Sequence, residues 1–440
     1  MKERIVGTIA LASVILIPAY LYLSGYQFYL MLFIFFYPLF MGAIWISGAL
    51  YFWFQWERHW AWRPSDPPVI PEDCLVTILI PCYNEQANCE ETISAALSQQ
   101  HQHIEVIAIN DGSSDDTGQL LDQLSQRDER LRIIHLANNQ GKAMALTMGA
   151  LAARSPYLVC IDGDALLESD AVNYLVHPLI AHPQVAAITG NPRIRTRSTL
   201  VGRIQVGEFS SIIGLIKRTQ RVFGRLFTVS GVICAFRRDA LEEVDYWSLN
   251  MATEDIDITW KLQLRGWRAF YEPRALCWVL MPETVKGLWR QRQRWAQGGA
   301  ETFIKYLPKV THVKHHKLWG LLGDYYLSVL WSFSLAVTSL FWLVEYAGQQ
   351  SLIETTTAIP PSFTGLLLAC VCLLQFLTSL LIDRRYEPTI GRALYWVIWY
   401  PCVFWLINCL TCLRTFPTAM LKSRGRARWV SPDRGIEDGS

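Results

Sequence analysis

Two carboxylates stand one residue apart in the middle of the chain, directly after an apolar run. The run covers 157–161 and is typical of a buried strand, and Asp162-Gly163-Asp164 follows it. Side chains alternate along an extended chain, so both aspartates would lie on one side. Carboxylate oxygens placed in this way suit a hard divalent cation, Mg²⁺ or Mn²⁺. The alternative is an ordinary turn, because Asp and Gly are both frequent turn residues.

A second acidic pair, Glu254-Asp255, stands after Thr253 and before an amphipathic helix expected at 256–265. A positioned carboxylate can take the proton from a hydroxyl group while that hydroxyl attacks, which makes Asp255 a candidate general base. Acidic residues are also favoured at helix N-termini by the helix dipole. A capping role for Glu254 or Asp255 is therefore the alternative.

Transfer of a sugar from a nucleotide-sugar would use both acidic pairs. A divalent cation would neutralise the diphosphate leaving group, and the general base would activate an acceptor hydroxyl. The nucleotide base would need a fixed hydrogen-bond acceptor. Asp111, which follows the apolar run 104–109, is a candidate for that acceptor.

These residues need a scaffold, and the chain from 75 to 189 predicts one. Apolar strand-like runs alternate with amphipathic helices, which indicates a mostly parallel sheet covered on both faces. The expected strands are 75–80, 104–109, 131–136, 157–161 and 185–189, and the expected helices are 85–99, 114–127, 141–154 and 169–182. Ligands in such folds bind beyond the carboxyl ends of the strands. Polar clusters begin there at 81–85, 110–114 and 162–164, which weakens the turn explanation for each.

Both flanks of this α/β region predict membrane helices. Of the 440 residues, 51% are hydrophobic and 12% aromatic, which is high for a soluble protein. No Asp, Glu, Lys, Arg or His occurs from 5 to 56, a run that can hold two spanning helices joined at 24–27. Further uncharged stretches cover 325–344, 363–382 and 393–413. The first run resembles a signal peptide, but no convincing cleavage site follows, so a retained anchor is expected.

Changes of composition along the chain predict its organisation. The segment 284–306 is basic on one side and carries large apolar residues, so it is expected to lie in the membrane interface. The expected parts are a membrane hairpin at 1–56, a proline-rich linker at 57–73, the α/β domain at 74–283, interfacial helices at 284–317, about three membrane helices at 318–416 and a basic tail at 417–440.

Charge and cysteine content narrow the partners and the compartment. The net charge of +2 gives no indication of nucleic-acid binding. Most of the 11 cysteines stand singly in apolar runs or fall within expected spans, and Cys409 and Cys412 have no second pair with which to hold a metal. The cysteines are therefore expected to be small apolar fillers in a reducing compartment.

The distribution of Lys and Arg predicts a cytosolic α/β domain. Lys2 and Arg4 precede the first span, the first turn carries no basic residue, and Arg58 follows the second span. The loop 348–362 has no Lys or Arg and is expected outside. Five full spans would put the basic tail outside as well, whereas its arginines argue for the inside. The sequence leaves that side open. The alternatives are a re-entrant or interfacial last segment, around Pro401, and a tail that does not follow the rule.

An ordered set of short motifs carries a resemblance to a known family. The motifs are Pro81-Cys-Tyr-Asn-Glu85, Asn110-Asp-Gly-Ser-Ser114, Asp162-Gly-Asp164, Thr253-Glu-Asp255 and Gln291-Arg-Gln-Arg-Trp295. In this order, with membrane spans on both sides, the chain resembles the processive family 2 glycosyltransferases of the cellulose, chitin and hyaluronan synthase type. More narrowly, the stretches 189–198, 227–232, 294–299 and 426–434 are similar to bacterial poly-β-1,6-N-acetylglucosamine synthases.

That resemblance implies a GT-A-like domain embedded between membrane helices, and it implies roles for single residues. The residues implied to bind the donor are Tyr83, Glu85, Asp111, Lys142 and Asp162. Asp164 is implied to coordinate Mg²⁺ or Mn²⁺, with Asp162 at the ribose or in the metal shell. Asp255 is implied to be the general base, beside Glu254. The residues implied to bind the diphosphate and the acceptor end are Gln291, Arg294 and Trp295.

Two of these roles have plain structural alternatives. Lys142 begins an expected helix, where a solvated lysine is common, and Trp295 falls in the expected interfacial segment, where a tryptophan often anchors the chain.

The implied activity is inverting, processive transfer of N-acetylglucosamine from UDP-GlcNAc to a growing β-1,6-linked polysaccharide, coupled to export across a bacterial inner membrane for biofilm matrix. The family also implies a small two-span accessory subunit and activation by cyclic dimeric GMP, although the sequence has no recognisable separate nucleotide-sensing domain. A chitin-like or hyaluronan-like synthase and a non-catalytic membrane export or scaffold protein are the alternatives. The presence of Asp164, Asp255 and Trp295 together argues against the last of these.

Overall fold

The computed structural model describes residues 2–62, 67–348, 363–422 and 425–426. Most of the loop expected outside the membrane and most of the basic tail, including Arg424, Arg428 and Arg434, therefore lie outside the described residues.

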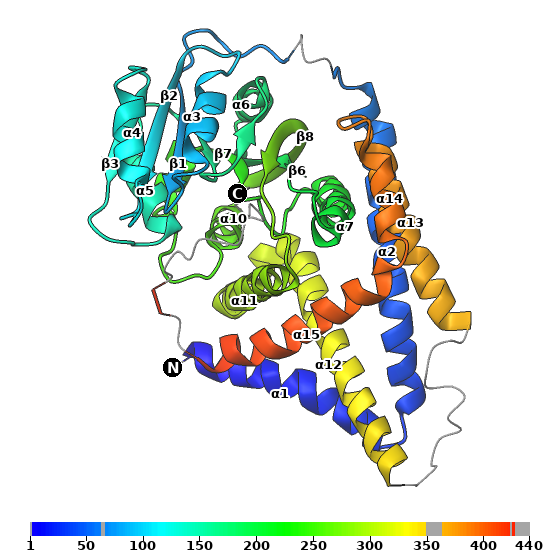
Figure 1. The fold of residues 1–440 in the computed structure, drawn as a ribbon. Coiled ribbons are helices and arrows are strands. Elements are labelled where there is room, and N and C mark those ends of the chain that lie inside the picture. The colour runs from blue at the N-terminus through cyan, green and yellow to red at the C-terminus, as the bar shows by residue number, and fades with distance from the viewer. Residues whose placement is uncertain (1, 63–66, 349–362, 423–424, 427–440) are drawn as a thin grey trace.

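An eight-stranded mixed sheet forms the centre of the α/β domain (Figure 1). Its order is β3-β2-β1-β4-β7-β6-β8-β5. The strands are β1 (Val76–Cys82), β2 (Ile104–Asn110), β3 (Leu131–His135), β4 (Tyr157–Ile161), β5 (Leu166–Leu167), β6 (Val185–Ile194), β7 (Ile233–Arg237) and β8 (Arg268–Val279). The first four strands are parallel, whereas β7 runs antiparallel to β4 and β6. The expected parallel half is thus confirmed, and β5, β7 and β8 extend it into a mixed sheet.

Helices cover both faces of this sheet, as expected for strands that are buried along their whole length. They are α3 (Cys89–Leu97), α4 (Thr117–Ser125), α5 (Lys142–Ala152), α6 (Ala171–Ala181), α9 (Arg238–Glu243) and α10 (Glu254–Leu264). The helix expected from residue 85 begins only at Cys89. Asn84 has a φ of +53° and turns the chain at the end of β1, a conformation that Asn tolerates better than most residues.

One long helical stretch joins the sheet to the membrane-type helices. It consists of α7 (Leu200–Phe209), a π-helical segment (Ser210–Leu215) and α8 (Ile216–Val222). Both α8 and the π segment contact α2, and the π segment also contacts α13. Short π segments within helices are rare and often mark functional positions.

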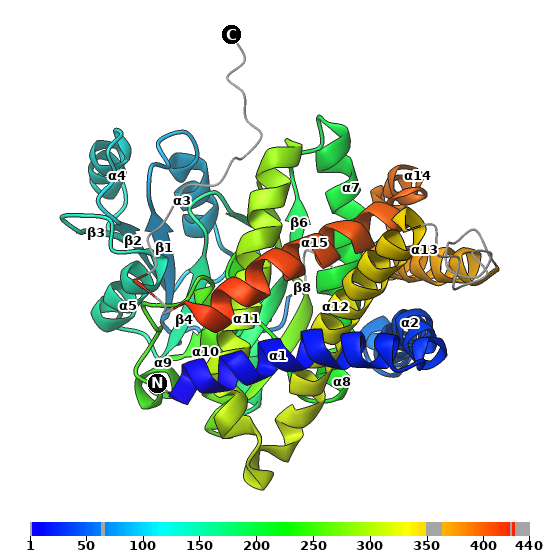
Figure 2. The same ribbon diagram turned by 90° about the horizontal axis from the view of Figure 1, so that it is seen from below.

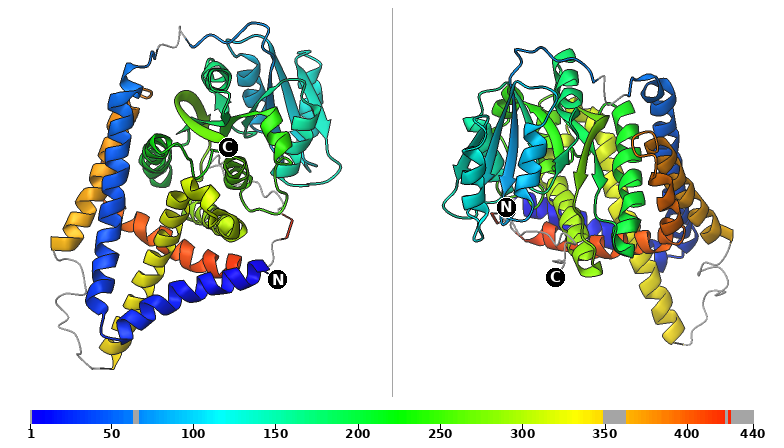
Figure 3. Two further views of the ribbon diagram at one scale, coloured as in Figure 1. Left: turned by 180° about the vertical axis from the view of Figure 1, so that it is seen from behind. Right: turned by 45° about the horizontal axis from the view of Figure 1, so that its top comes forward.

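Five described helices are long and apolar enough to cross a membrane. They belong to α1 (Lys2–Leu23), α2 (Gln27–Gln55), α12 (Trp319–Ala347), α13 (Phe363–Asp383) and α15 (Tyr400–Leu421). Helices α2 and α13 lie side by side along one flank of the α/β domain, whereas α1 and α15 pass beneath the domain (Figures 1 and 3).

The last membrane-type segment differs from the stretch expected at 393–413. A short 3₁₀ turn (Ile390–Ala393) and α14 (Leu394–Val397) come first, and α15 starts afresh at Tyr400 with a proline in its first two positions. Proline disfavours helical geometry in the residue before it but fits the first turn of a helix. The helix therefore restarts here and continues to Leu421, past the expected end.

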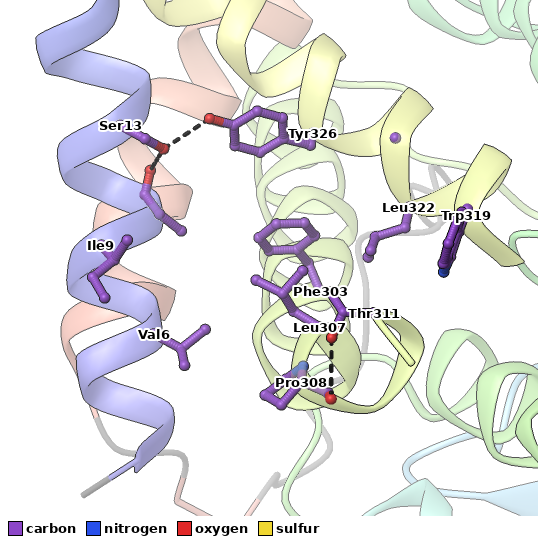
Figure 4. Close-up of a pocket in the computed structure, with 12 residues that line it drawn as sticks. Val6, Ile9, Ser13, Phe303, Leu307, Pro308, Thr311, Trp319, Leu322 and Tyr326 are labelled. Carbon is purple, nitrogen blue, oxygen red and sulfur yellow. Dashed lines mark hydrogen bonds between the residues drawn. The ribbon is translucent and has the colours of Figure 1, made fainter. Parts of the chain in front are cut away.

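Helix α11 (Val285–Val310), expected to be interfacial, lies between the α/β domain and the membrane-type helices (Figure 2). It packs on α10 from the domain and on α15, α12 and α1. A largely apolar groove of about 690 Å³ separates parts of α1, α11 and α12. Figure 4 shows Ser13 and Tyr326 meeting across it, with 2.8 Å between their hydroxyl oxygens.

A buried cluster of charges fastens α8 to α2 and α13. Arg218 donates to both carboxylate oxygens of Glu57 at 2.7 Å each and to Asp383 Oδ1 at 2.8 Å. Arg193 from β6 donates to Asp383 Oδ2 at 2.9 Å, and the hydroxyl of Tyr386 donates to Glu57 at 2.7 Å. The side chains of Arg218, Glu57 and Asp383 are 0% exposed. We call Glu57, Arg218 and Asp383 the clamp.

Removing the guanidinium from the clamp should destabilise the protein strongly. Arg218→Met would leave the buried carboxylate of Glu57 without its cation and Asp383 with Arg193 alone, and breaking a buried ion pair in this way typically costs about 3–5 kcal/mol. We expect a large fall in thermal unfolding temperature in detergent. The matched control is Arg127→Met, because the Arg127–Glu90 pair is 63% and 56% exposed and such pairs contribute little. Equal shifts for the two variants would contradict the clamp.

Candidate active site

The carboxyl ends of β1, β2 and β4 lie at one edge of the sheet because these strands are parallel. Cys82 at the end of β1 pairs with Asn110 at the end of β2, and β4 pairs with β1 on the other side. The three polar clusters expected from the sequence therefore begin at the same edge. Asp164 is buried there, with 7% of its surface exposed.

Asp111 braces the loop before α5. Its Oδ1 accepts from the amide of Gln140 at 2.7 Å and its Oδ2 from the amide of Gly141 at 2.8 Å. Burial raises its pKa, although the two amides and Arg426 act against that rise. Its expected contact with the nucleotide base stays a prediction; within the protein the carboxylate orders the turn that starts α5.

Glu85 and Tyr83 flank the same edge. Glu85 is 1% exposed and lies against the Asp-Gly-Asp turn, so that a Cβ on Gly163 would approach its Cγ to 3.0 Å. The amide of Glu85 donates to Thr117 Oγ1 at 2.8 Å, which holds the loop after β1 onto α4. Tyr83 is half-buried beside it.

Lys142 joins the two acidic pairs. Its ammonium lies 2.5 Å from Asp162 Oδ1 and 2.8 Å from Glu254 Oε1, and it donates to the carbonyl of Gly231 at 3.2 Å. Burial would lower the pKa of Lys142, but the two carboxylates outweigh burial and raise it. The solvated-lysine alternative does not hold, because only 15% of the side chain is exposed.

Asp255 is held at the start of α10 by backbone amides. Its Oδ2 accepts from Gly231 at 3.1 Å and its Oδ1 from Ile256 at 2.9 Å. Burial, followed by the negative charge of Glu254, raises the pKa of Asp255 to about 6. Glu254 behaves in the opposite way, because Lys142 outweighs burial and lowers its pKa. Two adjacent carboxylates thus differ in proton affinity, a pattern found in acid–base sites.

Helix α11 brings the Gln291–Trp295 motif to the same region. Arg294 is exposed and close enough to Glu254 for its charge to lower the pKa of that carboxyl, after burial and Lys142. A Cβ on Gly298 would lie 1.9 Å from Thr253 Oγ1. Only glycine therefore permits this approach of α11 to the residue that precedes Glu254 and Asp255.

Trp295 is half-buried. The centroid of its ring lies 5.9 Å from that of the Phe209 ring and 4.2 Å from the guanidinium carbon of Arg292. Arg292 pairs in turn with Glu208 at 2.8 Å. Gln291 accepts from Arg292 at 3.1 Å. The tryptophan thus packs against Phe209 of α7, and Arg292 contacts its ring.

The residues at the edge fit a hard divalent cation. Asp162 and Asp164 supply carboxylate oxygens. Burial, and then the negative charge of these two residues, raises the pKa of the neighbouring Cys277 thiol. Among the residues that the structure describes, no three His, Cys, Asp or Glu side chains gather closely enough to hold a metal by themselves. A cation at Asp162 and Asp164 would therefore need further oxygens from a bound diphosphate, as is usual for Mg²⁺.

The structure thus brings Asp162, Lys142, Glu254 and Asp255 into one connected cluster. Asp111 and Glu85 lie in the walls of its loops. Sequence reasoning missed Gly231 as the residue that touches both Lys142 and Asp255, although it falls in the family-like stretch 227–232. It also missed Lys217 and Arg218, whose signal was two adjacent cations after the uncharged run 209–216.

Comparisons with known proteins identify the family of this chain. Residues 71–298 match the family model described as glycosyltransferase like family 2. The chain is 39% identical over 404 residues to "Poly-beta-1,6-N-acetyl-D-glucosamine synthase" of Staphylococcus aureus (strain COL), with 92% of this chain and 98% of the relative covered. It is 37% identical over 409 residues to the protein of the same name from Staphylococcus epidermidis, with the same coverage.

A solved structure supports the fold. The mannosyltransferase PcManGT from Pyrobaculum calidifontis, in complex with GDP-Man and Mn²⁺, aligns with a TM-score of 0.54 and 20% identity over 85% of this chain and 99% of that chain. The expected GT-A-like domain with apolar helices near both termini is therefore confirmed. Because the family model spans the α/β domain and the alignments cover nearly the whole chain, this protein belongs to glycosyltransferase family 2.

Proposed function

We propose that this glycosyltransferase transfers N-acetylglucosamine from UDP-GlcNAc to a growing β-1,6-linked polysaccharide, with inversion and without release of the chain between additions. The observation that carries the proposal is the convergence of Asp255, Lys142 and Asp162 on one edge of a GT-A-like sheet. The names of the two Staphylococcus relatives support the sugar and the linkage.

Asp255 is the proposed general base. Two backbone amides fix its carboxylate, and its pKa of about 6 leaves it largely ionised at neutral pH yet basic enough to take a proton. A single base acting on an acceptor hydroxyl fits direct displacement at the sugar carbon, which inverts its configuration. Glu254 is held by Lys142 and stays ionised beside it.

Lys142 and Asp162 are the proposed ribose and phosphate side of the site. The ammonium group of Lys142 can donate hydrogen bonds beside Asp162, where the diphosphate of UDP-GlcNAc would lie. A Mg²⁺ or Mn²⁺ ion on Asp162 and Asp164 would supply positive charge to the leaving diphosphate. Tyr83, Glu85 and Asp111 remain the proposed walls of the nucleotide pocket, and Gln291, Arg294 and Trp295 the proposed contacts of diphosphate and acceptor.

We further propose that the enzyme resides in a bacterial inner membrane with its catalytic domain in the cytosol, and that the apolar helices help to export the polymer. The organisation expected from the sequence, from the hairpin at 1–56 to the basic tail at 417–440, belongs to this proposal. A small two-span accessory subunit and cyclic dimeric GMP are further partners that the resemblance implies. Nucleic acid is not among them.

The tail is proposed to lie on the same side as the catalytic domain. Tyr400, the first residue of α15, donates to Glu208 of α7 at 3.1 Å. Beyond the other end of α15, Arg426 attracts the carboxylate of Asp111. Both ends of α15 therefore lie near the catalytic domain, and the helix passes beneath it (Figure 2).

The product identifies the activity. Purified protein in lipid nanodiscs, with any accessory subunit supplied, should convert UDP-GlcNAc and Mg²⁺ into a polymer whose methylation analysis reports 6-linked residues. A product cleaved only by a β-1,4-specific chitinase would contradict the linkage and favour chitin-like synthesis. A requirement for glucuronate would indicate the hyaluronan-like alternative, and absence of any transfer the scaffold alternative.

Asp255→Asn should lower the polymerisation rate by about 10²–10⁴-fold, the usual contribution of a general base. The amide keeps the shape of the side chain, so binding of UDP, measured by titration calorimetry, should stay unchanged. The matched control is Asp245→Asn, an exposed position with φ +57° that Asn also accepts. Full activity in Asp255→Asn would remove Asp255 from the base role.

Asp164→Ala should abolish most activity and weaken metal binding together. The expected measurement is Mn²⁺ binding in the presence of UDP, followed by electron paramagnetic resonance, which does not depend on turnover. Asp122→Ala is the control, because this aspartate is 58% exposed and pairs with His135 on the surface. Unchanged turnover after chelation of divalent ions would overturn the metal assignment.

A further inference from the structure

Two adjacent cations on α8 lie in different surroundings. Lys217 is 4% exposed and Arg218 is 0% exposed. Arg218 belongs to the clamp with Glu57, in the short 3₁₀ helix Glu57–His59 that follows α2, and with Asp383 of α13. Lys217 instead donates to Thr189 Oγ1 of β6 at 3.1 Å and to Ser230 Oγ at 2.7 Å. The proposed reaction does not use Lys217, and burying an ammonium group costs free energy unless it is paired and hydrogen-bonded.

The partners of Lys217 form the turn that seats the proposed base. The amide of Ser230 donates to Thr189 Oγ1 at 2.8 Å, so one lysine and one threonine fix this residue. The next residue, Gly231, donates its amide to Asp255 Oδ2 at 3.1 Å and receives Lys142 on its carbonyl at 3.2 Å. Lys217 is therefore one residue removed from the hydrogen bond that positions Asp255.

The turn at Ser230–Gly231 is closely packed against the acidic cluster. A Cβ on Gly231 would lie 3.0 Å from Lys142 Nζ, 3.1 Å from Glu254 Oε1 and 3.3 Å from Asp255 Oδ2. A small movement of the Ser230–Gly231 turn would therefore change the position of Asp255 relative to Lys142. Misplacement of a reacting group by about 1 Å can cost about 10²-fold in rate.

Lys217 also acts on Asp255 through charge. Burial lowers the pKa of Lys217 to about 7, and the ionisable groups that act against this fall are Asp255 from α10 and Cys234 from β7. Burial holds the Cys234 thiol neutral by raising its pKa. Asp255 is therefore the anionic partner of Lys217 in this region, and a charged Lys217 favours ionised Asp255.

The other side of α8 is fixed to the membrane-type helices at several points besides the clamp. Thr219 donates to the carbonyl of Trp45 in α2 at 2.9 Å. A Cβ on Gly48 of α2 would lie 2.3 Å from Thr219 Cγ2, so only glycine permits this contact. In the adjoining π segment, Ser211 accepts from Gln375 of α13 at 3.0 Å.

We propose that Lys217 is a positioning residue for Asp255, and that α8 transmits the packing of α2 and α13 to the position of this catalytic base. Lys217 holds the Ser230–Gly231 turn on one side of α8, and the clamp and Thr219 hold the membrane-type helices on the other. The inference rests on the proposed role of Asp255. It goes beyond that role by making turnover depend on the packing of membrane helices.

The first test compares Lys217→Met with Lys217→Gln. We expect Lys217→Met to lower kcat by about 10²-fold with UDP affinity unchanged. The acidic limb of kcat/KM, which in the wild type should fall through about pH 6 as Asp255 protonates, should move to higher pH, because loss of a nearby cation favours the neutral carboxyl. Lys217→Gln keeps a donor to the turn, so it should recover part of kcat but keep the shifted limb.

Lys261→Met is the matched control for Lys217→Met. Lys261, near the C-terminal end of α10, is also partly buried and donates to the backbone carbonyls of residues 244–246. It should change stability without moving the acidic limb. A folded Lys217→Met or Lys217→Gln with wild-type kcat and an unmoved limb would overturn the inference. Full activity of Asp255→Asn would instead overturn the base role, so the two failures are distinguishable.

The second test perturbs only the membrane side of α8. Gly48→Ala places a methyl group against Thr219 and should lower kcat severalfold without a change in UDP affinity. Gly320→Ala in α12 is the control, because a Cβ there meets nothing within 4 Å. Wild-type kcat in Gly48→Ala, with the same unfolding temperature as Gly320→Ala, would contradict the coupling between α2 and the base.

Discussion

The active edge of this enzyme depends on a crowding of negative charge around one lysine. Asp162 and Asp164 follow β4, Lys142 joins Asp162 to Glu254, and Asp255 is the next residue after Glu254. Arg294 and Lys217 also act on Glu254 and Asp255 through charge. Burial, followed by the negative charge of Glu254, raises the pKa of Asp255, and the carboxylates of Asp162 and Asp164 suit a divalent cation. The proposed base and the proposed metal site thus belong to one acidic cluster.

This acidic cluster requires a rigid frame, because carboxylates held close together repel one another. Backbone amides supply part of that frame at Asp111 and Asp255. The rest comes from outside the α/β domain. Arg218 is buried between the carboxylates of Glu57, just after α2, and Asp383, at the end of α13. A buried ion pair is geometrically demanding even where it adds little net stability. The catalytic domain is therefore joined to its membrane-type helices through specific side chains.

The sequence predicted the parts of the site that lie within single motifs. The strand before Asp162 was predicted to the residue, and the clusters at 81–85, 110–114 and 253–255 fall where expected. The sequence could not predict the clamp, since Glu57 and Asp383 lie 161 and 165 residues from Arg218 and nothing local pairs them. Lys217 shares that limit: a buried lysine at an amphipathic position looks like a solvated one until its hydroxyl partners are known.

The position of α15 supports the proposed side of the tail, which charge counting left open. Five crossings would carry the basic tail away from the side of the catalytic domain, against the positive-inside tendency. A helix that is fixed to Glu208 at its start and is followed by Arg426 near Asp111 does not need to cross. Four crossings by α1, α2, α12 and α13 would then return the chain to its starting side. Proline at the start of α15 gives the physical reason, because it ends the preceding turn and lets the new helix leave in another direction.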